Sequence, residues 1–302
     1  FNAHLETIYP ALFRRVKFTF DSLETIDTPD GDKLDIAYTV KTSSSLAIIT
    51  HGLEGNNQRS YIRGMAKALH TQGIDVLAWN FRGCGDKPNH KLRFYHSGAT
   101  DDLDTVVRYA QQAFGHTHIY LVGFSLGGNI SLKYAAEAMP EVVKKVVAIS
   151  VPLHLKSSCE KISQPGNTLY ARRFLKSLKR KITSKAAVMP GLRTSDLPAI
   201  RTIYAFDNCY TAPLHGFTDA DDYYARCSAL FVLEKIKTPT LIINARNDPF
   251  LSGTCFPDLS HPFVKMLTPA KGGHVGFASF NARGLYWSEQ QAINFLAQAV
   301  DY

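Results

Sequence analysis

The stretch HIYLVGFSLGGNISLKYAAEA, residues 118–138, joins a strand pattern to a helix pattern through glycines. The apolar run at 118–122 predicts a buried strand, and 126–138 predicts a helix. Between them lies G-x-S-x-G, with Ser125 flanked by Gly123 and Gly127. A serine on a tight strand-to-helix turn is held in a strained conformation, and glycines let the chain pack closely around it. The turn therefore predicts Ser125 as a nucleophile; the alternative is a glycine-rich turn with a capping serine.

Strand and helix patterns alternate on both sides of this stretch. Strands are predicted at 14–20 (RRVKFTF), 33–39, 46–50, 74–80, 144–150, 239–245 and 263–268, and helices at 61–71, 101–114 and 287–300. Continuous apolar strands that alternate with helices are typical of an α/β fold whose mostly parallel sheet is covered on both faces. The alternation is lost over 151–228, which predicts an insertion into one split domain formed by 1–150 and 229–302.

A serine nucleophile needs a base, and the base needs an acid to orient it. Asp248 follows the strand predicted at 239–245, and His274 follows a Gly-Gly pair after the strand predicted at 263–268. Loops that follow parallel strands meet at one edge of a sheet, so both side chains should lie near Ser125. The chain order serine, acid, histidine also fits this kind of site. Asp258 is the rival acid, and a turn-forming Asn-Asp-Pro is the structural alternative for Asp248.

Attack on a carbonyl also requires donors for the oxyanion that forms. The backbone N–H of Leu126 supplies one, at the start of a helix. We expect the second from Leu53, in the loop THGLEG after the strand at 46–50. His51 and Gly52 would support this loop, for which a simple glycine turn is the alternative.

Other candidate sites have weaker support. His96 and Asp101 have the H-x-x-x-x-D spacing of some acyltransferases, but eleven histidines make chance matches common, and acids are favoured at helix starts. His116 and His118 lack acid or cysteine neighbours that would complete a metal site. The five cysteines are widely spaced without a C-x-x-C pair, which argues against disulfides and zinc and favours a reducing, cytoplasmic environment.

Positive charge is concentrated between Lys156 and Arg193, a segment with ten Lys or Arg residues and one acid, Glu160. Apolar residues at helical spacing lie among them and predict a basic amphipathic helix: Tyr170, Phe174, Leu175, Leu178 and Ile182. Two interpretations are open, peripheral contact with an anionic membrane and an ordinary solvated helix face. No nucleic-acid-binding motif accompanies the charge, so nucleic acid is not an expected partner.

Composition excludes several classes of protein. The 302 residues are 45% hydrophobic and 20% charged, which disfavours a disordered or collagen-like chain. No apolar run approaches the roughly 18 residues that cross a bilayer. The composition leaves the oligomeric state open.

Several stretches resemble the α/β-hydrolase superfamily and its YheT-like branch of serine esterases: NAHLETIYPA, THGLEGNNQRSYIRGMA, NFRGCGDKPNHKLRFYHSG, GFSLGGN, FDNCYTAPLHGFTDADDYY and GGHVGF. The resemblance implies an eight-stranded sheet, a helical cap and a triad of Ser125, Asp248 and His274, with no metal or organic cofactor. It also implies cleavage of small-molecule or lipid carboxylic esters. Acyl transfer and thioester cleavage use the same residues, and a non-catalytic binding protein is the alternative of another class.

Overall fold

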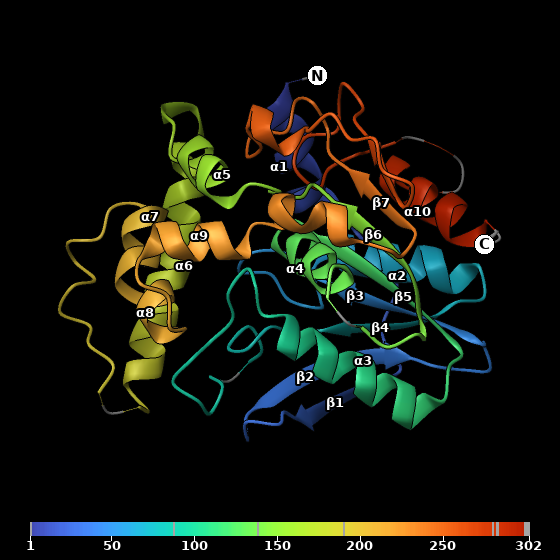
Figure 1. Ribbon diagram of the computed structural model, residues 1–302, viewed down its shortest axis with the longest axis horizontal. Helices are drawn as coiled ribbons and strands as arrows, with labels where there is room; N and C mark the ends of the chain where they lie inside the picture. Colours follow the sequence, from blue (N-terminus) through green and yellow to red (C-terminus); the bar gives the residue numbers. More distant parts are fainter. Residues whose placement is uncertain are drawn as a thin grey trace.

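The computed structural model describes residues 2–86, 88–137, 139–189, 191–279, 281 and 284–298. Within these residues, one sheet has the strand order β1-β2-β4-β3-β5-β6-β7-β8 (Figure 1). The strands are β1 (Ser22–Asp27), β2 (Lys33–Thr39), β3 (Ser45–Thr50), β4 (Asp75–Trp79), β5 (His118–Phe124), β6 (Val143–Ile149), β7 (Thr240–Ile243) and β8 (Val264–Leu267). β2 is antiparallel to both of its neighbours, and the pairs from β4 to β8 are parallel. The predicted mostly parallel, eight-stranded sheet is confirmed.

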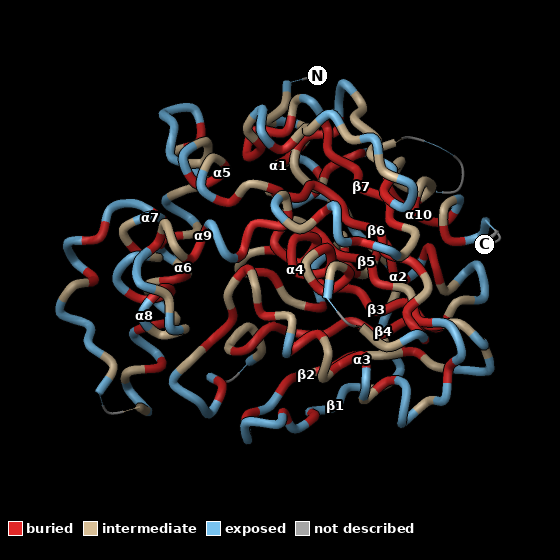
Figure 2. Tube along the Cα trace, in the orientation of Figure 1, coloured by how far each residue is buried: buried red, intermediate tan, exposed pale blue. Residues whose placement is uncertain are grey.

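Helices cover both faces of the sheet, because successive strand residues point to opposite sides. Leu46 and Ile48 of β3 pack in one core with α3 (Thr100–Phe114) and α4 (Leu126–Ala135). Ala47 and Ile49 pack in the other core with α2 (Ser60–Thr71) and α10 (Trp287–Ala297). Figure 2 shows the resulting buried centre. The helices predicted at 126–138 and 287–300 are α4 and α10; Ala138 and Val300 lie outside the described residues.

The prediction of a strand at 14–20 is wrong. These residues form no strand, and β1 lies instead at Ser22–Asp27. The alternating aromatic residues reflect packing, because Phe18 and Phe20 lie against the core beneath α2 and contact each other edge to face. The Phe18 carbonyl accepts a hydrogen bond from Arg63 Nε, not from a neighbouring strand. β1 has little apolar signal because it is an exposed edge strand.

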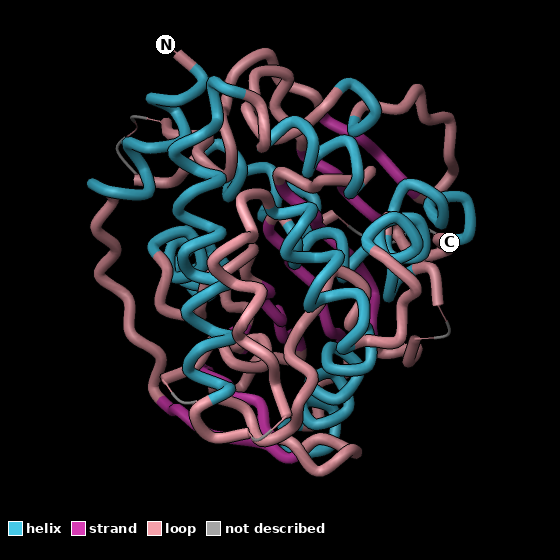
Figure 3. Tube along the Cα trace, turned by 90° about the vertical axis from the view of Figure 1, so that its left-hand side faces the viewer, coloured by secondary structure: helices cyan, strands magenta, loops and turns pink. Residues whose placement is uncertain are grey.

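Helices fill the chain between β6 and β7. They are α5 (Leu155–Ile162), η1 (Pro165–Asn167), α6 (Thr168–Ala186), α7 (Ile203–Phe206), η2 (Asp207–Thr211), α8 (Ala212–Leu214), α9 (Ala220–Cys227) and η3 (Ala229–Lys235). η4 (Gly253–Cys255) follows β7, and α1 (Ala3–Phe13) precedes the sheet. The group from α5 to α9 lies beside the sheet, at its left in Figure 1 and toward the viewer in Figure 3.

α6 is the predicted basic amphipathic helix, but its cations do not all face solvent. Leu175, Leu178 and Ile182 are buried, as the spacing predicts. Lys185 is also buried, where its Nζ donates to Asn89 Oδ1 and to the Arg93 carbonyl. The net charge of this segment therefore overstates what it presents to solvent.

A buried arginine fixes the loop that follows β4. Arg82 is 2% exposed and donates to three carboxylates, those of Asp30, Asp32 and Asp102. These acids come from the β1–β2 turn and from α3, so one guanidinium joins three segments. Removing one partner of a buried ion pair leaves uncompensated charge, which costs far more than the loss of an exposed pair.

Arg82→Ala is expected to lower the free energy of unfolding by about 3 kcal/mol, since two buried carboxylates, those of Asp32 and Asp102, lose their cation. Arg108→Ala is the matched control, because Arg108 pairs with Asp104 on the exposed side of α3. Urea denaturation followed by circular dichroism measures both. Equal, small losses in the two variants would show that the Arg82 cluster does not hold these segments.

Candidate active site

Ser125 lies on a strained turn between β5 and α4. Its φ is +53° and its ψ is −119°, a backbone conformation that residues other than glycine rarely adopt. A Cβ at Gly123 would lie 2.4 Å from the Gly127 carbonyl oxygen, and a Cβ at Gly127 would lie 2.4 Å from the His51 carbonyl oxygen. Both glycines are therefore required for the chain to turn this tightly, as the sequence predicts.

The structure brings Ser125, His274 and Asp248 together. His274 Nε2 lies 3.0 Å from Ser125 Oγ, and His274 Nδ1 lies 2.8 Å from Asp248 Oδ2. The Asp248 side chain is fully buried, and its Oδ1 accepts the Phe250 N–H. With the Nδ1 proton held by the carboxylate, Nε2 is left to accept the serine proton. Asp248, not Asp258, is the carboxylate bonded to His274.

The loop after β3 lies against Ser125. A Cβ at Gly52 would lie 3.0 Å from Ser125 Cβ, a tight contact that a side chain could make only if its neighbours shifted. The Gly52 N–H donates to Tyr61 Oη, which leaves the next amide, that of Leu53, as the candidate oxyanion donor. The Leu126 amide is at the first position of α4, where helical N–H groups lack partners within the helix.

His51 supports this loop from inside the protein. Its ring bonds the Gly52 carbonyl through Nδ1 and accepts the Phe81 N–H at Nε2. Burial lowers the pKa of His51 to about 3, so the ring stays neutral. The ring thus lies behind the loop, in contact with the Gly52 carbonyl.

Glu54 and Lys181 connect the same loop to α6. Glu54 has a φ of +52° and lies 2.6 Å from Lys181 Nζ, with Tyr95 and Ser177 donating to the same carboxylate. Burial would raise the pKa of Glu54, but the Lys181 ammonium and these hydrogen bonds hold it below its ordinary value. The sequence analysis missed this pair. The spacing could have indicated it, because Lys181 is three residues after Leu178 and so lies near the buried side of the basic helix.

α1 holds the loop that contains His274, a contact that sequence reasoning also missed. Thr7 Oγ1 accepts the His274 N–H at 2.9 Å. Glu6 Oε2 accepts the Gly272 N–H at 2.9 Å and a proton of the Asn247 amide at 2.7 Å. Glu6 and Thr7 thus fix the backbone on both sides of the acid–histidine pair.

A small cavity opens beside Ser125. Its volume is about 100 Å³, and its wall includes Leu53 and Leu126. Residues of α5 to α9 form much of the remaining wall, among them Leu155, Ile162, Leu178, Ile203 and Tyr223. His96 also lines it, and burial together with nearby His215 lowers the pKa of His96, which favours a neutral ring. The cavity therefore suits an uncharged, mainly apolar group.

The weaker sequence candidates do not form sites. Asp101 pairs with Arg93, and His96 packs against His215. His116 Nε2 lies 2.9 Å from Asp75 Oδ2, and the exposed His118 ring lies within hydrogen-bond distance of Thr117 Oγ1. Within the described part of the chain, no three His, Cys, Asp or Glu side chains gather as metal ligands, and the five cysteines are free.

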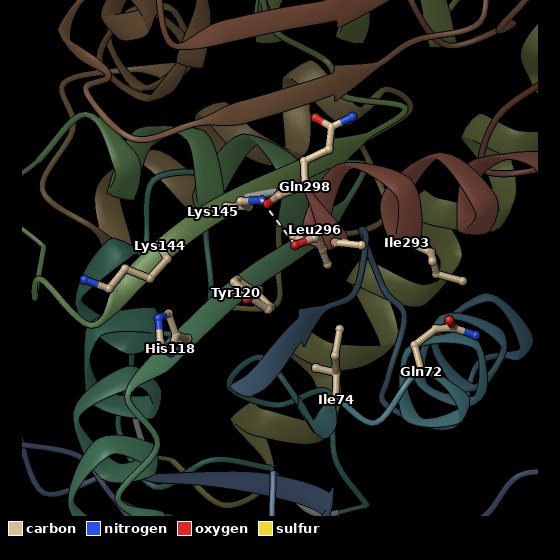
Figure 4. A pocket seen from close by; sticks show the side chains of 10 residues that line it. Gln72, Ile74, His118, Tyr120, Lys144, Lys145, Ile293, Leu296 and Gln298 are labelled. Atoms are coloured by element: carbon tan, nitrogen blue, oxygen red, sulfur yellow. Dashed lines mark hydrogen bonds between the residues drawn. The ribbon is translucent and has the colours of Figure 1, made fainter. Parts of the chain in front are cut away.

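A larger hollow of about 570 Å³ lies at the opposite edge of the sheet (Figure 4). His118 and Lys145, near the amino ends of β5 and β6, line it together with the end of α10. Lys145 Nζ is directed at the Phe295 and Leu296 carbonyls and is fully engaged there. Because Ser125 follows the carboxyl end of β5, this hollow is not part of the site.

Comparison with known proteins agrees with the fold. Residues 48–278 match the family described as alpha/beta hydrolase fold. The chain is 37% identical to the putative esterase YheT of Escherichia coli over 287 residues, covering 91% of this chain and 84% of that protein. The chain belongs to the α/β-hydrolase family, in its YheT-like branch. Membership makes it a hydrolase of the esterase and lipase type.

Two further matches are more distant. A monoacylglycerol lipase of Saccharomyces cerevisiae is 27% identical, and the match covers 89% of this chain and 62% of the yeast protein. An esterase structure from Pyrococcus furiosus superposes with a TM-score of 0.62 at 18% identity, covering 91% of this chain and 90% of that one. The latter similarity supports the fold alone. No described helix is long and apolar enough to span a membrane.

Thr7→Val is expected to lower kcat for p-nitrophenyl acetate about tenfold with little change in KM, because small displacements of a positioned group are costly. Thr7→Ser keeps the acceptor and should restore most of the rate. Thr105→Val, which removes an exposed hydroxyl bonded within α3, is the matched control. A Thr7→Val enzyme with unaltered kcat would show that α1 does not position His274.

Proposed function

We propose that the chain is a serine hydrolase that cleaves carboxylic esters through an acyl-enzyme intermediate. The observation that supports this most strongly is the hydrogen-bonded chain from Ser125 through His274 to Asp248. The G-x-S-x-G turn presents Ser125 beside the cavity, and two candidate oxyanion donors border the same space. The relationship to a putative esterase and to a monoacylglycerol lipase agrees with ester substrates.

In the first half of the proposed reaction, Ser125 Oγ attacks the ester carbonyl carbon while its proton passes to His274 Nε2. The carbonyl oxygen becomes an oxyanion, held by the Leu53 and Leu126 amides. The C–O bond to the alcohol then breaks, and His274 returns the proton to the departing oxygen. Asp248 keeps the ring oriented and stabilises its positive charge throughout.

In the second half, water replaces the alcohol. His274 removes a proton from the water, the resulting hydroxide attacks the acyl carbon, and the bond to Ser125 Oγ breaks as the proton returns to that oxygen. The products are the carboxylic acid, the alcohol and the free enzyme. We propose that residues 151–228 act as a cap, since their side chains form much of the cavity wall.

Ser125→Ala is expected to lower hydrolysis of p-nitrophenyl butyrate by more than about 10³-fold and to abolish labelling by a fluorophosphonate. Ser44→Ala, which alters an exposed loop serine, is the control and should match the wild type. Labelling without ester turnover would favour a thioester substrate or an acyl acceptor other than water. Product analysis with added glycerol would detect acyl transfer to that alcohol. A folded wild-type chain that shows neither signal would favour a ligand-binding protein.

The cavity supports a short acyl group. Its volume of about 100 Å³ is below the roughly 150 Å³ of a cavity that accepts benzene. In a p-nitrophenyl ester series, kcat/KM should therefore be highest for acetyl to butyryl esters and fall for octanoyl. Ile162→Ala should move the optimum to longer chains, because Ile162 lines the cavity. Leu192→Ala should not, because Leu192 lies in the loop after α6 and is not among the residues that line the cavity. A palmitoyl optimum in the wild type would contradict this assignment.

A further inference from the structure

The exposed side of α1 carries a row of large apolar side chains. Leu5, Tyr9, Leu12 and Phe13 are 58%, 48%, 53% and 63% exposed. Their spacing of four, seven and eight residues places them on one face of the helix. Glu6 and Thr7 bond to the His274 loop. The buried residues of α1 are Thr7 and Pro10, so the large apolar side chains are the ones that the helix leaves in solvent.

The first turn of α6 lies beside the start of α1. His4 stacks on Tyr170 with ring centroids 5.8 Å apart, and His4 Nδ1 lies 3.2 Å from Tyr170 Oη. Leu169, beside Tyr170, is 78% exposed and has the highest exposure among the large apolar residues of the described chain. The starts of α1 and α6 are therefore neighbours. We call the surface formed by Leu5, Tyr9, Leu12, Phe13 and Leu169 the α1–α6 face.

Basic residues border the α1–α6 face. Arg172 and Arg173 follow Leu169 on α6, and Arg15 and Lys17 follow α1; all four are exposed. α6 contains no acid, and Glu6, the acid of α1, is bonded to the His274 loop. The α1–α6 face thus combines exposed apolar side chains with excess positive charge. This combination is complementary to an anionic bilayer, whose headgroups attract cations and whose acyl region accepts apolar groups.

The α1–α6 face also lies beside the reaction site. Tyr170 contacts Phe250 with ring centroids 4.8 Å apart, and Phe250 contacts His274 at 4.3 Å. Two aromatic rings therefore separate His4, next to Leu5 of the α1–α6 face, from the proposed base. A second copy of the chain would bring the same cations to this surface, and like charges across an interface are unfavourable. Charge thus favours a lipid surface over self-association.

We propose that the α1–α6 face docks the protein on anionic lipid bilayers, with Leu12, Phe13 and Leu169 entering the interface and Arg172 and Arg173 contacting headgroups. This inference goes beyond ester cleavage and does not depend on it. It also relocates the membrane contact considered for the whole basic segment 156–193. In that segment Lys181 pairs with Glu54, Lys179 donates to the Ile200 carbonyl, and Lys185 is buried.

Co-sedimentation with phosphatidylcholine vesicles, with and without phosphatidylglycerol, tests the proposal. The wild type should bind the phosphatidylglycerol vesicles, and binding should weaken as salt rises. The double variants Leu12→Ser/Phe13→Ser and Arg172→Glu/Arg173→Glu should each weaken the apparent affinity about tenfold or more. Ser125→Ala should bind as the wild type does, so that docking and ester cleavage can fail separately.

Matched controls lie elsewhere on the surface. Leu23→Ser removes an apolar side chain 70% exposed on β1, and Lys235→Glu/Lys237→Glu reverses two exposed charges before β7. Both should leave vesicle binding unchanged, and thermal unfolding verifies that every variant is folded. No preference for phosphatidylglycerol, or equal losses in the controls, would overturn the proposal. A wild-type dimer that Leu12→Ser/Phe13→Ser converts to monomer would also overturn it, by assigning the α1–α6 face to a second copy.

Discussion

The site depends on one close approach of backbone to backbone. The turn at Ser125 brings Gly127 so near the end of β3 that a single methyl group would overlap the His51 carbonyl oxygen. This packing keeps Ser125 at a positive φ and joins the start of α4 to the loop that contains Leu53. The proposed nucleophile and both candidate oxyanion donors are thereby fixed by the same contact. The strain is offset by the two cores that hold the central strands on either side.

Two elements outside the central sheet connect to this contact. Through Lys181, α6 holds Glu54, the residue next to Leu53. Through Glu6 and Thr7, α1 holds the loop of His274. The oxyanion side and the base side of the proposed site are therefore each braced by a helix that also meets solvent. α1 and α6 contact each other at His4 and Tyr170. From there, Tyr170 and Phe250 are the two rings that connect His4 to His274, the proposed base.

Physical reasoning from the sequence reaches the sheet and the grouping of Ser125, Asp248 and His274, because loops after parallel strands must meet at one edge. It does not reach α1, whose bonds to Gly272 and His274 span more than 260 residues and come from an ordinary Glu and Thr. It misplaces the first strand, because alternating aromatic residues also suit an irregular segment packed on a helix. It counts Lys181 and Lys185 among the cations of a basic helix face that meets either membrane or solvent, since their partners Glu54 and Asn89 are distant in sequence.

In the proposed mechanism, Ser125 forms a covalent acyl intermediate. The most direct measurement is mass spectrometry of the wild-type protein quenched in acid within milliseconds to seconds of mixing with p-nitrophenyl butyrate. A transient butyryl adduct confined to the peptide that contains Ser125, and absent at the end of turnover, is the predicted result. An adduct on another residue during turnover would contradict this mechanism. So would the absence of any adduct under conditions in which nitrophenol is released in a burst.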